Sequence, residues 1–337
     1  MNILLTGASG FVGHYIIQEL FEFHTCVPLI DERGTVDLRD INRIKSFLSS
    51  DTNALLYKQQ SENLQILNSR HSLNSHIDIT ENSQNFNFDA VIHLAAQSFV
   101  PESFKNPLET YNINFIGTYN LFSALKEYGF CGKILYISSG DIYGHVDEDK
   151  LPITEDYPLK PRNPYAVSKV SAEALCYQWS ATEDMEIVIA RPFNHIGPNQ
   201  SERFVVSSFA KQITEISLCL KKPVIIAGNI DTTRDFLDVR DVAAAYKLLL
   251  EKGINSDIYN VCSGKEVAMR SIINTLCNIA GVEVEIEIDE NKLRPNEQKR
   301  VCGSNDKIKK VTEWEQKIPL EKSLADIFGY WKEKLKK

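Results

Sequence analysis

Patterns typical of buried strands and amphipathic helices alternate from the first residues of the chain. Residues 2–6 (NILLT) form a short apolar run of the kind found in a strand that is buried on both faces. A glycine-rich turn follows, then helical spacing of apolar residues over 14–23 and a second apolar run over 26–31 (CVPLID). Strand, helix and strand within about 30 residues predict a β-α-β unit.

The same alternation continues to about residue 195. Apolar runs at 89–96 (DAVIHLAA), 133–139 (KILYISS) and 186–194 (EIVIARPFN) predict further strands. Helical patterns over 107–128 and 165–180 separate them. Strands that alternate with helices in this way predict an α/β fold built on a doubly wound parallel sheet.

After this point the pattern changes and predicts a smaller, mixed C-terminal lobe. We assign residues 1–195, with a return at about 238–261, to a dinucleotide-binding domain. Residues 196–237 and 262–337 then form the substrate-binding lobe. Within it, VEVEIEID (282–289) alternates strictly, as a half-exposed strand does.

A polar stretch at residues 51–86, rich in Asn, Ser and Gln, lacks clear periodicity. Two segments near it, VDLRD (36–40) and HIDIT (76–80), both resemble the end of a third strand. We favour VDLRD, followed by a helix over 41–50. Residues 51–86 are then a possible insertion.

Composition and charge limit the classes of function. Hydrophobic residues make up 43% of the 337 residues and charged residues 24%, as in ordinary globular proteins. The net charge of -8 argues against nucleic acid and anionic membranes as partners, so an anionic ligand needs positive charge gathered locally. Seven scattered cysteines, without a C-x-x-C pair or zinc spacing, predict reduced thiols and no metal site. With neither a signal-peptide pattern nor an 18-residue apolar stretch, we expect a cytoplasmic protein.

Three glycines, Gly7, Gly10 and Gly13, lie between the first predicted strand and helix. Glycine lets the backbone approach a pyrophosphate, and a helix N-terminus supplies N–H donors and partial positive charge. Asp31 ends the second strand, where a carboxylate can accept hydrogen bonds from both ribose hydroxyls of NAD. Arg33 can instead pair with the 2′-phosphate of NADP, so NAD is favoured and NADP stays open. The plain structural alternatives are a glycine-rich turn that binds no ligand and, for Asp31, a turn aspartate in D-E-R-G.

A Y-x-x-x-K pattern places Tyr165 and Lys169 on one face of a predicted helix. A lysine beside a phenol favours the phenolate, so we expect a lowered pKa for Tyr165, which would exchange a proton with a substrate oxygen. Ser138 and Ser139 end a strand, where the ligand crevice of a doubly wound sheet lies, and Ser139 can bond the same oxygen. Tyr–Lys pairs are common on helix surfaces; the preceding glycine loop and serine-terminated strand make this one specific.

Five segments in this order, TGASGFVG, HLAAQSFV, NFIGTYNL, YISSGDIYG and PYAVSK, resemble the extended short-chain dehydrogenase/reductase family. The resemblance covers nearly the whole chain. It implies a Rossmann domain, NAD(H) or NADP(H) as cofactor, a nucleotide-sugar substrate and a homodimer built on a four-helix interface. It also implies Ser139, Tyr165 and Lys169 as the catalytic set. The cofactor-binding residues that it implies are Gly7, Gly10, Phe11, Val12, Gly13, Asp31, Asp37, Leu38, Leu94, Ala95, Ala96, Asn114, Tyr165 and Lys169.

The second half of the chain narrows the resemblance. RPFNHIGPNQ (191–200), RDFLDVRDVAAAY (234–246) and LRPNEQ (293–298) are most similar to GDP-4-keto-6-deoxy-D-mannose reductases. This implies reduction of the 4-keto group of a GDP-linked 4-keto-6-deoxy hexose or heptose, giving a product such as GDP-D-rhamnose. The implied substrate-binding residues are Gln97, Ser139, Asn194, Val205, Lys211, Arg234, Arg294 and Glu297. Arginines suit phosphate oxygens, although ion pairs of Arg234 with Asp235 or Asp238 are an alternative.

One departure bears on the type of reaction. A 4,6-dehydratase needs an acid/base carboxylate after the hydroxyl residue, and here Ser139 is followed by Gly140 and Asp141. Gly140 transfers no proton, and Asp141 is one methylene shorter than the glutamate usual in the dehydratases. We therefore favour a reductase, with an NAD-dependent 4,6-dehydratase, a 4-epimerase or a non-catalytic dinucleotide sensor as alternatives. His195 is interpreted as structural, because isolated histidines seldom carry chemistry without an oriented partner.

Overall fold

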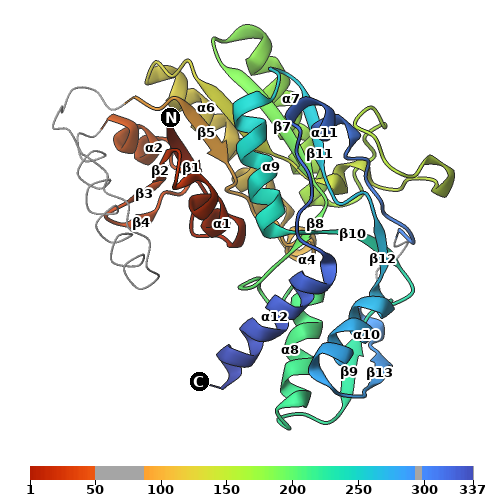
Figure 1. Ribbon diagram of the computed structural model, residues 1–337. Coiled ribbons are helices and arrows are strands. Elements are labelled where there is room, and N and C mark those ends of the chain that lie inside the picture. Colours follow the sequence, from red (N-terminus) through yellow and green to blue (C-terminus); the bar gives the residue numbers. More distant parts are fainter. Residues whose placement is uncertain (50–86, 293–297, 337) are drawn as a thin grey trace.

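A six-stranded parallel sheet forms the centre of the computed structural model, which describes residues 1–49, 87–292 and 298–336 (Figure 1). The strand order is β11-β7-β6-β5-β1-β2. All neighbours pair in parallel, so their carboxyl ends meet at one edge of the sheet. The strands are β1 (Asn2–Thr6), β2 (Thr25–Pro28), β5 (Ala90–His93), β6 (Lys133–Ile137), β7 (Glu186–Pro192) and β11 (Ile258–Val261).

Helices cover both faces of this sheet (Figure 1). On one face, α2 (Ile41–Ser49), α6 (Gly117–Glu127) and α7 (Pro164–Thr182) enclose a core that includes Phe122 and Trp179. On the other face, α1 (Phe11–Leu20), α9 (Val239–Lys252) and α11 (Asp306–Thr312) enclose a core that includes Leu20 and Tyr246. Between β5 and α6 the chain forms α4 (Val100–Lys105), α5 (Pro107–Tyr111) and the π-helix η1 (Asn112–Ile116). The predicted doubly wound parallel sheet is confirmed.

A second group of elements lies beyond the carboxyl edge, around its own apolar core (Figure 1). Ile213, Ile272 and Ile327 are fully buried there, one from each of its three helices. These elements are α8 (Val205–Ser217), α10 (Met269–Ala280), α12 (Leu320–Leu335), β9 (Val224–Ala227) and β13 (Glu285–Ile288). The last of them lies within the strand predicted at 282–289. A three-stranded sheet, made of β8 (Asn194–Ile196), β10 (Thr233–Asp238) and β12 (Glu266–Ala268), joins the two groups.

The region after β2 differs from the prediction. The run predicted as one strand over 26–31 breaks after Pro28, and β3 (Ile30–Asp31) pairs with β4 (Gly34–Thr35) in a separate hairpin. VDLRD is wrong as a third strand: residues 36–40 form the connection into α2. Val36 and Leu38 are apolar because they pack in the core beneath α2 and α6, not because they pair in the sheet. The helix predicted at 41–50 is confirmed over Ile41–Ser49, whereas residue 50, HIDIT and the 51–86 insertion lie outside the described residues.

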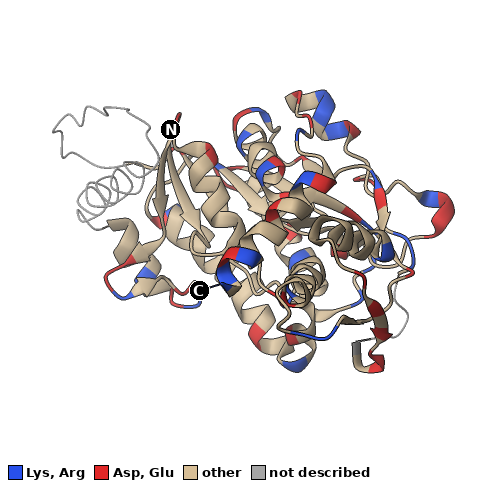
Figure 2. Ribbon diagram, turned by 60° about the horizontal axis from the view of Figure 1, so that its bottom comes forward, with Lys and Arg blue, Asp and Glu red and all other residues tan. Residues whose placement is uncertain are grey.

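Charge is spread along the whole chain. Figure 2 shows Lys and Arg interspersed with Asp and Glu over the helices and loops of that view. Positive charge for a diphosphate must therefore come from individual side chains at the site. None of the helices in the described ranges has the length and apolar character needed to cross a bilayer.

Candidate active site

The glycine loop connects β1 to α1 in a tight turn at the carboxyl edge of the sheet. Gly7 has φ +73°, and a Cβ on it would lie 2.8 Å from the Ala95 nitrogen. A Cβ on Gly13 would lie 2.5 Å from the Ala8 carbonyl oxygen. Gly10 precedes α1 as its N-cap, without a side chain to cap the free N–H groups. The turn is therefore too tight for a side chain at Gly7 or Gly13 and leaves the N–H groups at the start of α1 without a side-chain cap, which fits a dinucleotide pyrophosphate.

A buried histidine fastens this loop to the neighbouring strand. His93 Nδ1 lies 2.8 Å from the Thr6 hydroxyl and its Nε2 lies 2.9 Å from the Thr118 hydroxyl. The Ala95 N–H donates to Thr6 Oγ1 at 3.1 Å, which holds the Leu94–Ala96 strand end beside the glycine loop. Burial lowers the pKa of His93 to about 3, so this histidine is a neutral structural link.

Asp31, at the end of β3, is already bound by arginines. Arg43 on α2 donates from Nε to Asp31 Oδ2 at 2.7 Å and also pairs with Oδ1, and the Arg33 N–H donates to Oδ1 at 2.8 Å. These hydrogen bonds, with Arg43 the largest cause, hold the pKa of Asp31 far below its usual range. The Arg33 side chain is 63% exposed beside this pair. Positive charge therefore dominates the place where the adenosine ribose is expected.

The other implied cofactor residues are distributed around this loop. The ring of Phe11 stacks on His195 at 6.1 Å, which supports the structural interpretation of His195. Burial lowers the pKa of His195, whose Nδ1 lies 3.2 Å from the Phe193 carbonyl oxygen. Asp37 pairs with Arg39, and Leu38 is buried in the core. The structure thus brings the glycine loop and the Leu94–Ala96 strand end together, but it gives Asp37 an arginine partner of its own.

Tyr165 and Lys169 lie on the first turns of α7, and local sequence explains why the helix begins there. The Asn163 side chain accepts a hydrogen bond from the Ala166 N–H at 2.7 Å, and Pro164 occupies the first helical position. Both functional side chains are buried, with Tyr165 8% and Lys169 3% exposed. The Lys169 ammonium donates to the Ile137 carbonyl oxygen at 2.6 Å, at the end of β6.

Ser139 follows β6 and meets Tyr165. Its hydroxyl accepts a hydrogen bond from the Asp141 N–H at 3.2 Å, which caps the 3-10 helix η2 (Gly140–Tyr143). Ser139 also forms a hydrogen bond with the Tyr165 hydroxyl. The structure therefore brings Ser139, Tyr165 and Lys169 together at the carboxyl edge of the sheet, from a strand end and a helix far apart in sequence.

The predicted direction of the tyrosine shift is wrong. Burial raises the pKa of Tyr165 above its ordinary value, and the hydrogen bond with Ser139 opposes this only in part. Burial also lowers the pKa of Lys169 to about 8. The cost of desolvating the phenolate exceeds the effect of the hydrogen bond with Ser139, and Asp141 adds to it, so Tyr165 is a protonated donor at neutral pH.

Asn114 connects the loop after β5 to α7. It is 1% exposed, its Nδ2 donates to the Ser168 hydroxyl at 2.9 Å, and its Oδ1 accepts from the Gln97 N–H at 2.8 Å. The Gln97 amide is in turn held by Thr110, whose hydroxyl accepts from Gln97 Nε2 at 3.2 Å. Asn114 therefore orients the loop that borders the site instead of pointing freely into it.

The implied diphosphate-binding residues lie on neighbouring strands beyond that edge. In β8 and β10, Asn194 pairs with Phe236, two residues after Arg234. Arg234 Nη1 donates to the Thr233 and Gln298 carbonyl oxygens at 2.7 and 3.0 Å. Arg294 and Glu297 lie outside the described residues.

Two further implied residues lie on α8. Val205, its first residue, is 43% exposed next to Phe204, whose ring contacts Phe99 at 6.1 Å across the two groups of elements. Lys211 pairs with Glu202 and lies over the Trp331 ring at 5.6 Å. The structure therefore places Val205 at a junction between the two groups and gives Lys211 partners within its own group.

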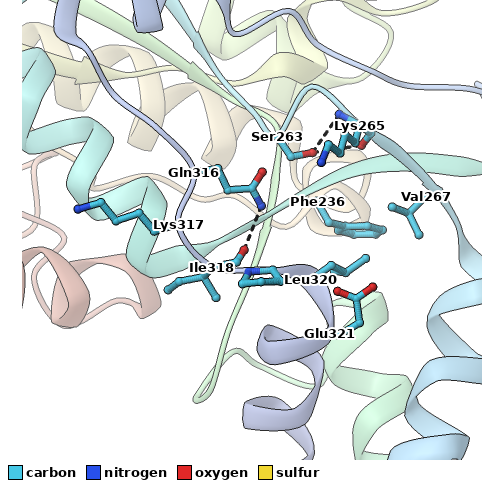
Figure 3. Close-up of a pocket in the computed structure, with 10 residues that line it drawn as sticks. Phe236, Ser263, Lys265, Val267, Gln316, Lys317, Ile318, Leu320 and Glu321 are labelled. Atoms are coloured by element: carbon cyan, nitrogen blue, oxygen red, sulfur yellow. Dashed lines mark hydrogen bonds between the residues drawn. The ribbon is translucent and has the colours of Figure 1, made fainter.

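A cavity of about 360 Å³ lies among β10, β12 and the start of α12 (Figure 3). Phe236, Val267 and Leu320 form its apolar part, and Lys265 and Lys317 lie at its border. It shares no residue with Ser139, Tyr165 and Lys169, so it is separate from the catalytic set.

Sequence reasoning missed several residues that shape the site. Arg43, which binds Asp31, lies 12 residues away on an amphipathic helix, where an arginine ordinarily faces solvent. Glu173 and Arg191 form a buried ion pair behind Lys169, with 2.7 Å between Arg191 Nη2 and Glu173 Oε2. No local pattern indicates either contact, because each depends on how separate elements pack.

Comparison with known proteins agrees with this geometry. A Pseudomonas aeruginosa protein named GDP-6-deoxy-D-mannose reductase is 49% identical over 335 residues, 99% of this chain and 98% of the relative. The solved structure of RMD from Pseudomonas aeruginosa complexed with NADPH has a TM-score of 0.84 at 39% identity, covering 99% of this chain and 100% of that one. UDP-glucose 4-epimerase from Thermus thermophilus, solved with NAD, has a TM-score of 0.76 at 24% identity over 98% and 99% of the two chains, a likeness in fold alone.

The fold and the site define an oxidoreductase of the extended short-chain dehydrogenase/reductase type, as the sequence predicts. Within that type, the chain belongs to the GDP-mannose 4,6 dehydratase family, whose model matches residues 4–327. The resemblance and the enzyme class derived from the sequence are therefore confirmed.

Proposed function

We propose that this enzyme reduces the 4-keto group of a GDP-linked 4-keto-6-deoxy sugar to a hydroxyl, with NAD(P)H as the reductant. The observation that carries the proposal is the Ser139–Tyr165–Lys169 set at the carboxyl edge of the sheet, in which Tyr165 and Lys169 are buried and Ser139 is half-buried. The 49% identical relative named as a GDP-6-deoxy-D-mannose reductase and the structural neighbour with NADPH support both the reaction and the cofactor.

The three side chains have separate roles in this reaction. A reduced nicotinamide, when bound, supplies the hydride to the carbonyl carbon. Tyr165 donates its proton to the carbonyl oxygen, and its raised pKa keeps that proton in place at neutral pH. Ser139 bonds the same oxygen, and the Lys169 ammonium stabilises the phenolate that Tyr165 becomes. One hydride and one proton convert the ketone to an alcohol.

The turn after Ser139 supports reduction over dehydration. A Cβ on Gly140 would lie 3.1 Å from the Phe193 ring, and one on Gly303 would lie 2.7 Å from the same ring. Phe193 is thus packed between two glycines, and a side chain at position 140 would press on its ring. Asp141 is the remaining acid after Ser139, and it faces Tyr165 closely enough to raise the pKa of that tyrosine.

The test is absorbance at 340 nm with purified enzyme, NADPH or NADH, and GDP-4-keto-6-deoxy-mannose. Loss of absorbance that needs both partners is the expected result. No loss, together with conversion of GDP-mannose to a keto sugar by enzyme that retains NAD, would overturn the proposal in favour of a dehydratase. GDP in place of the sugar nucleotide is the control for unspecific oxidation.

We further propose that NADPH is preferred over NADH. Both Asp31 oxygens are engaged by Arg43, so this carboxylate is a poor acceptor for the ribose hydroxyls of NAD. The exposed Arg33 guanidinium, on the β3–β4 hairpin, suits a 2′-phosphate. The hairpin contacts the glycine loop through Ser9 and Thr35, whose hydroxyls lie 3.5 Å apart.

A homodimer is the third part of the proposal. Apolar side chains on α5, η1, α6 and α7 face solvent in a single chain: Leu108 75%, Ile116 41%, Tyr119 48% and Tyr177 67% exposed. A second copy that covers these helices would bury the group through a two-fold four-helix contact. Light scattering should give twice the chain mass, and Tyr177→Glu should give a monomer. A monomeric wild type would refute this part.

The diphosphate-binding residues and the cellular compartment complete the proposal. Asn194 and Arg234, beyond the carboxyl edge, are proposed to bind the diphosphate of the substrate. All seven cysteines are free thiols in the structure, which supports a reducing, cytoplasmic location. If Arg234 binds the diphosphate, Arg234→Ala should lose affinity for GDP and retain affinity for NADPH.

A further inference from the structure

A buried polar chain adjoins the catalytic set, on α7, β7 and η2. Arg191 on β7 is 3% exposed and Glu173 on α7 is 5% exposed. The guanidinium donates from Nε to Glu173 Oε1 at 3.0 Å and from Nη2 to Glu173 Oε2 at 2.7 Å. Its Nη1 donates to the Tyr143 hydroxyl at 2.9 Å and to the Glu155 carbonyl oxygen at 3.0 Å. Nearly all donors of a buried arginine are therefore satisfied.

The chain continues to the turn that carries Ser139. Tyr143, which is fully buried, is the last residue of η2, the short helix that Ser139 caps. Its hydroxyl donates to Asn260 Oδ1 at 2.7 Å, and Asn260 Nδ2 donates to the Ile153 carbonyl oxygen at 3.0 Å. The Arg191 guanidinium also lies over the Tyr143 ring at 5.0 Å. One network thus joins α7, β7, β11 and the Ser139 turn.

Stability alone is a weak reason for such a network. A buried ion pair often contributes no more than well-packed apolar residues of the same volume, because desolvation offsets the attraction. The position of the network, next to Lys169 and to the Ser139 turn, indicates its role instead. Glu173 is one helical turn beyond Lys169 on α7, so the two side chains share a face of the helix. Tyr143 is four residues after Ser139 along the chain.

The surroundings of Lys169 make Glu173 important. Groups that face Lys169 are Tyr165 and Cys176 on α7, Tyr136 on β6, with its ring 5.0 Å from Nζ, and His93 on β5. Burial raises the pKa of Tyr136, Tyr165 and Cys176 and lowers that of His93, so all four are neutral near pH 7. Burial lowers the pKa of Lys169, and Cys176 and Glu173 oppose this in part. Because the Cys176 thiol is neutral, the Glu173 carboxylate is the partner that brings negative charge.

We propose that the Glu173–Arg191–Tyr143 chain is a positioning device for the reducing site. It fixes Lys169 and the Ser139 turn relative to each other, and Glu173 supplies the negative charge that keeps the Lys169 ammonium protonated. These three are positioning residues and act through Lys169 and Ser139. The inference rests on the proposed function, in which both of those residues contact the reacting groups.

The first test is the pH dependence of Glu173→Gln, compared with Glu186→Gln, which removes the same charge at an exposed strand start. NADPH affinity by fluorescence and kcat/KM at 340 nm are measured from pH 6 to pH 10. In Glu173→Gln we expect the alkaline limb of the NADPH-affinity profile and of the kcat/KM profile to shift to lower pH by about one unit. In Glu186→Gln neither limb should shift. A purely structural role would lower stability at every pH and leave the limb in place, which would overturn the proposal.

Two additional variants keep the test informative. If Glu173→Gln does not fold, Glu173→Gln with Arg191→Gln removes both buried charges. Glu173 raises the pKa of Lys169 and Arg191 is not among the groups that shift it, so the alkaline limb of the double variant must still lie below that of the wild type. Tyr143→Phe keeps the ring and loses the hydroxyl, so kcat should fall about tenfold with the limb unchanged. Full activity of Tyr143→Phe would overturn the link to the Ser139 turn.

NADPH binding needs no sugar substrate, which separates the two possible failures. A shifted binding limb in Glu173→Gln, with no turnover of the keto sugar by any variant or by the wild type, would refute the proposed function alone. An unshifted limb in a folded Glu173→Gln enzyme that turns over the keto sugar would refute the positioning device alone.

Discussion

Replacing Lys169 by methionine should abolish reduction and at the same time make the protein more stable. Lys169 is 3% exposed, and its ammonium donates to the Ile137 carbonyl oxygen and lies over the Tyr136 ring. Burial lowers its pKa from 10.5 to about 8, so the folded state disfavours the charged form. Methionine has a similar length and no charge to desolvate.

The magnitude follows from that pKa. Each pH unit corresponds to about 1.4 kcal/mol, so the drop from 10.5 to about 8 costs about 3 kcal/mol of folding free energy at pH 7. Loss of the hydrogen bond to the Ile137 carbonyl oxygen destabilises the variant by about 1 kcal/mol. The net gain in the free energy of unfolding is therefore about 2 kcal/mol. The cost is fully present below the folded-state pKa and disappears as the pH rises towards 10.5, because the lysine is then neutral in both states.

Urea unfolding of wild type and Lys169→Met at pH 7 and at pH 10 measures this difference. We expect the variant to be more stable at pH 7 and the advantage to shrink at pH 10. Lys105→Met, at an exposed lysine on α4, is the matched control and should change stability little at either pH. A variant less stable than the wild type at pH 7, or an advantage that is equal at both values, would refute the reasoning.

Four other predictions follow from the same geometry. Tyr165→Phe should lower kcat by a factor of about 100 or more while NADPH affinity, measured by fluorescence, stays nearly unchanged; full activity would contradict its role as proton donor. Arg33→Ala should lower kcat/KM for NADPH by about tenfold and leave that for NADH unchanged, and equal losses for both would disprove a 2′-phosphate contact. Gly13→Ala should weaken NADPH binding by about tenfold or more, because its Cβ would meet the Ala8 carbonyl oxygen at 2.5 Å; unchanged binding in a titration would exclude a rigid loop. Asp141→Asn should retain keto-sugar reduction at 340 nm, whereas its loss would point to proton transfer by Asp141.

Some of the site could be predicted because its signals are local. The glycine loop must join a strand to a helix within a few residues, and Gly7, Gly10 and Gly13 show that requirement directly in the sequence. The Tyr165–Lys169 spacing likewise acts within one or two helical turns. Such features depend on backbone geometry over short distances.

Other expectations failed where burial and packing decide. VDLRD has the apolar residues of a strand, yet Val36 and Leu38 are buried by helices and form no part of the sheet. The pKa of Tyr165 was expected to fall beside a lysine, but enclosure of both groups raises it. A sequence pattern shows which residues are apolar or charged, whereas the loss of water around them depends on every element that packs against them.

By itself, the sequence determined the doubly wound sheet, the glycine-rich turn between its first strand and helix, and the spacing of Tyr165 and Lys169 on one helix, because periodicity and short spacings control each of these. The tertiary structure alone decided that Arg43 neutralises Asp31 and that Arg191 joins Glu173 to Tyr143 behind Lys169. These contacts join residues from different elements, and no local spacing encodes them. Electrostatics at the site is therefore a property of the folded chain, since it depends on distance and desolvation that only packing creates.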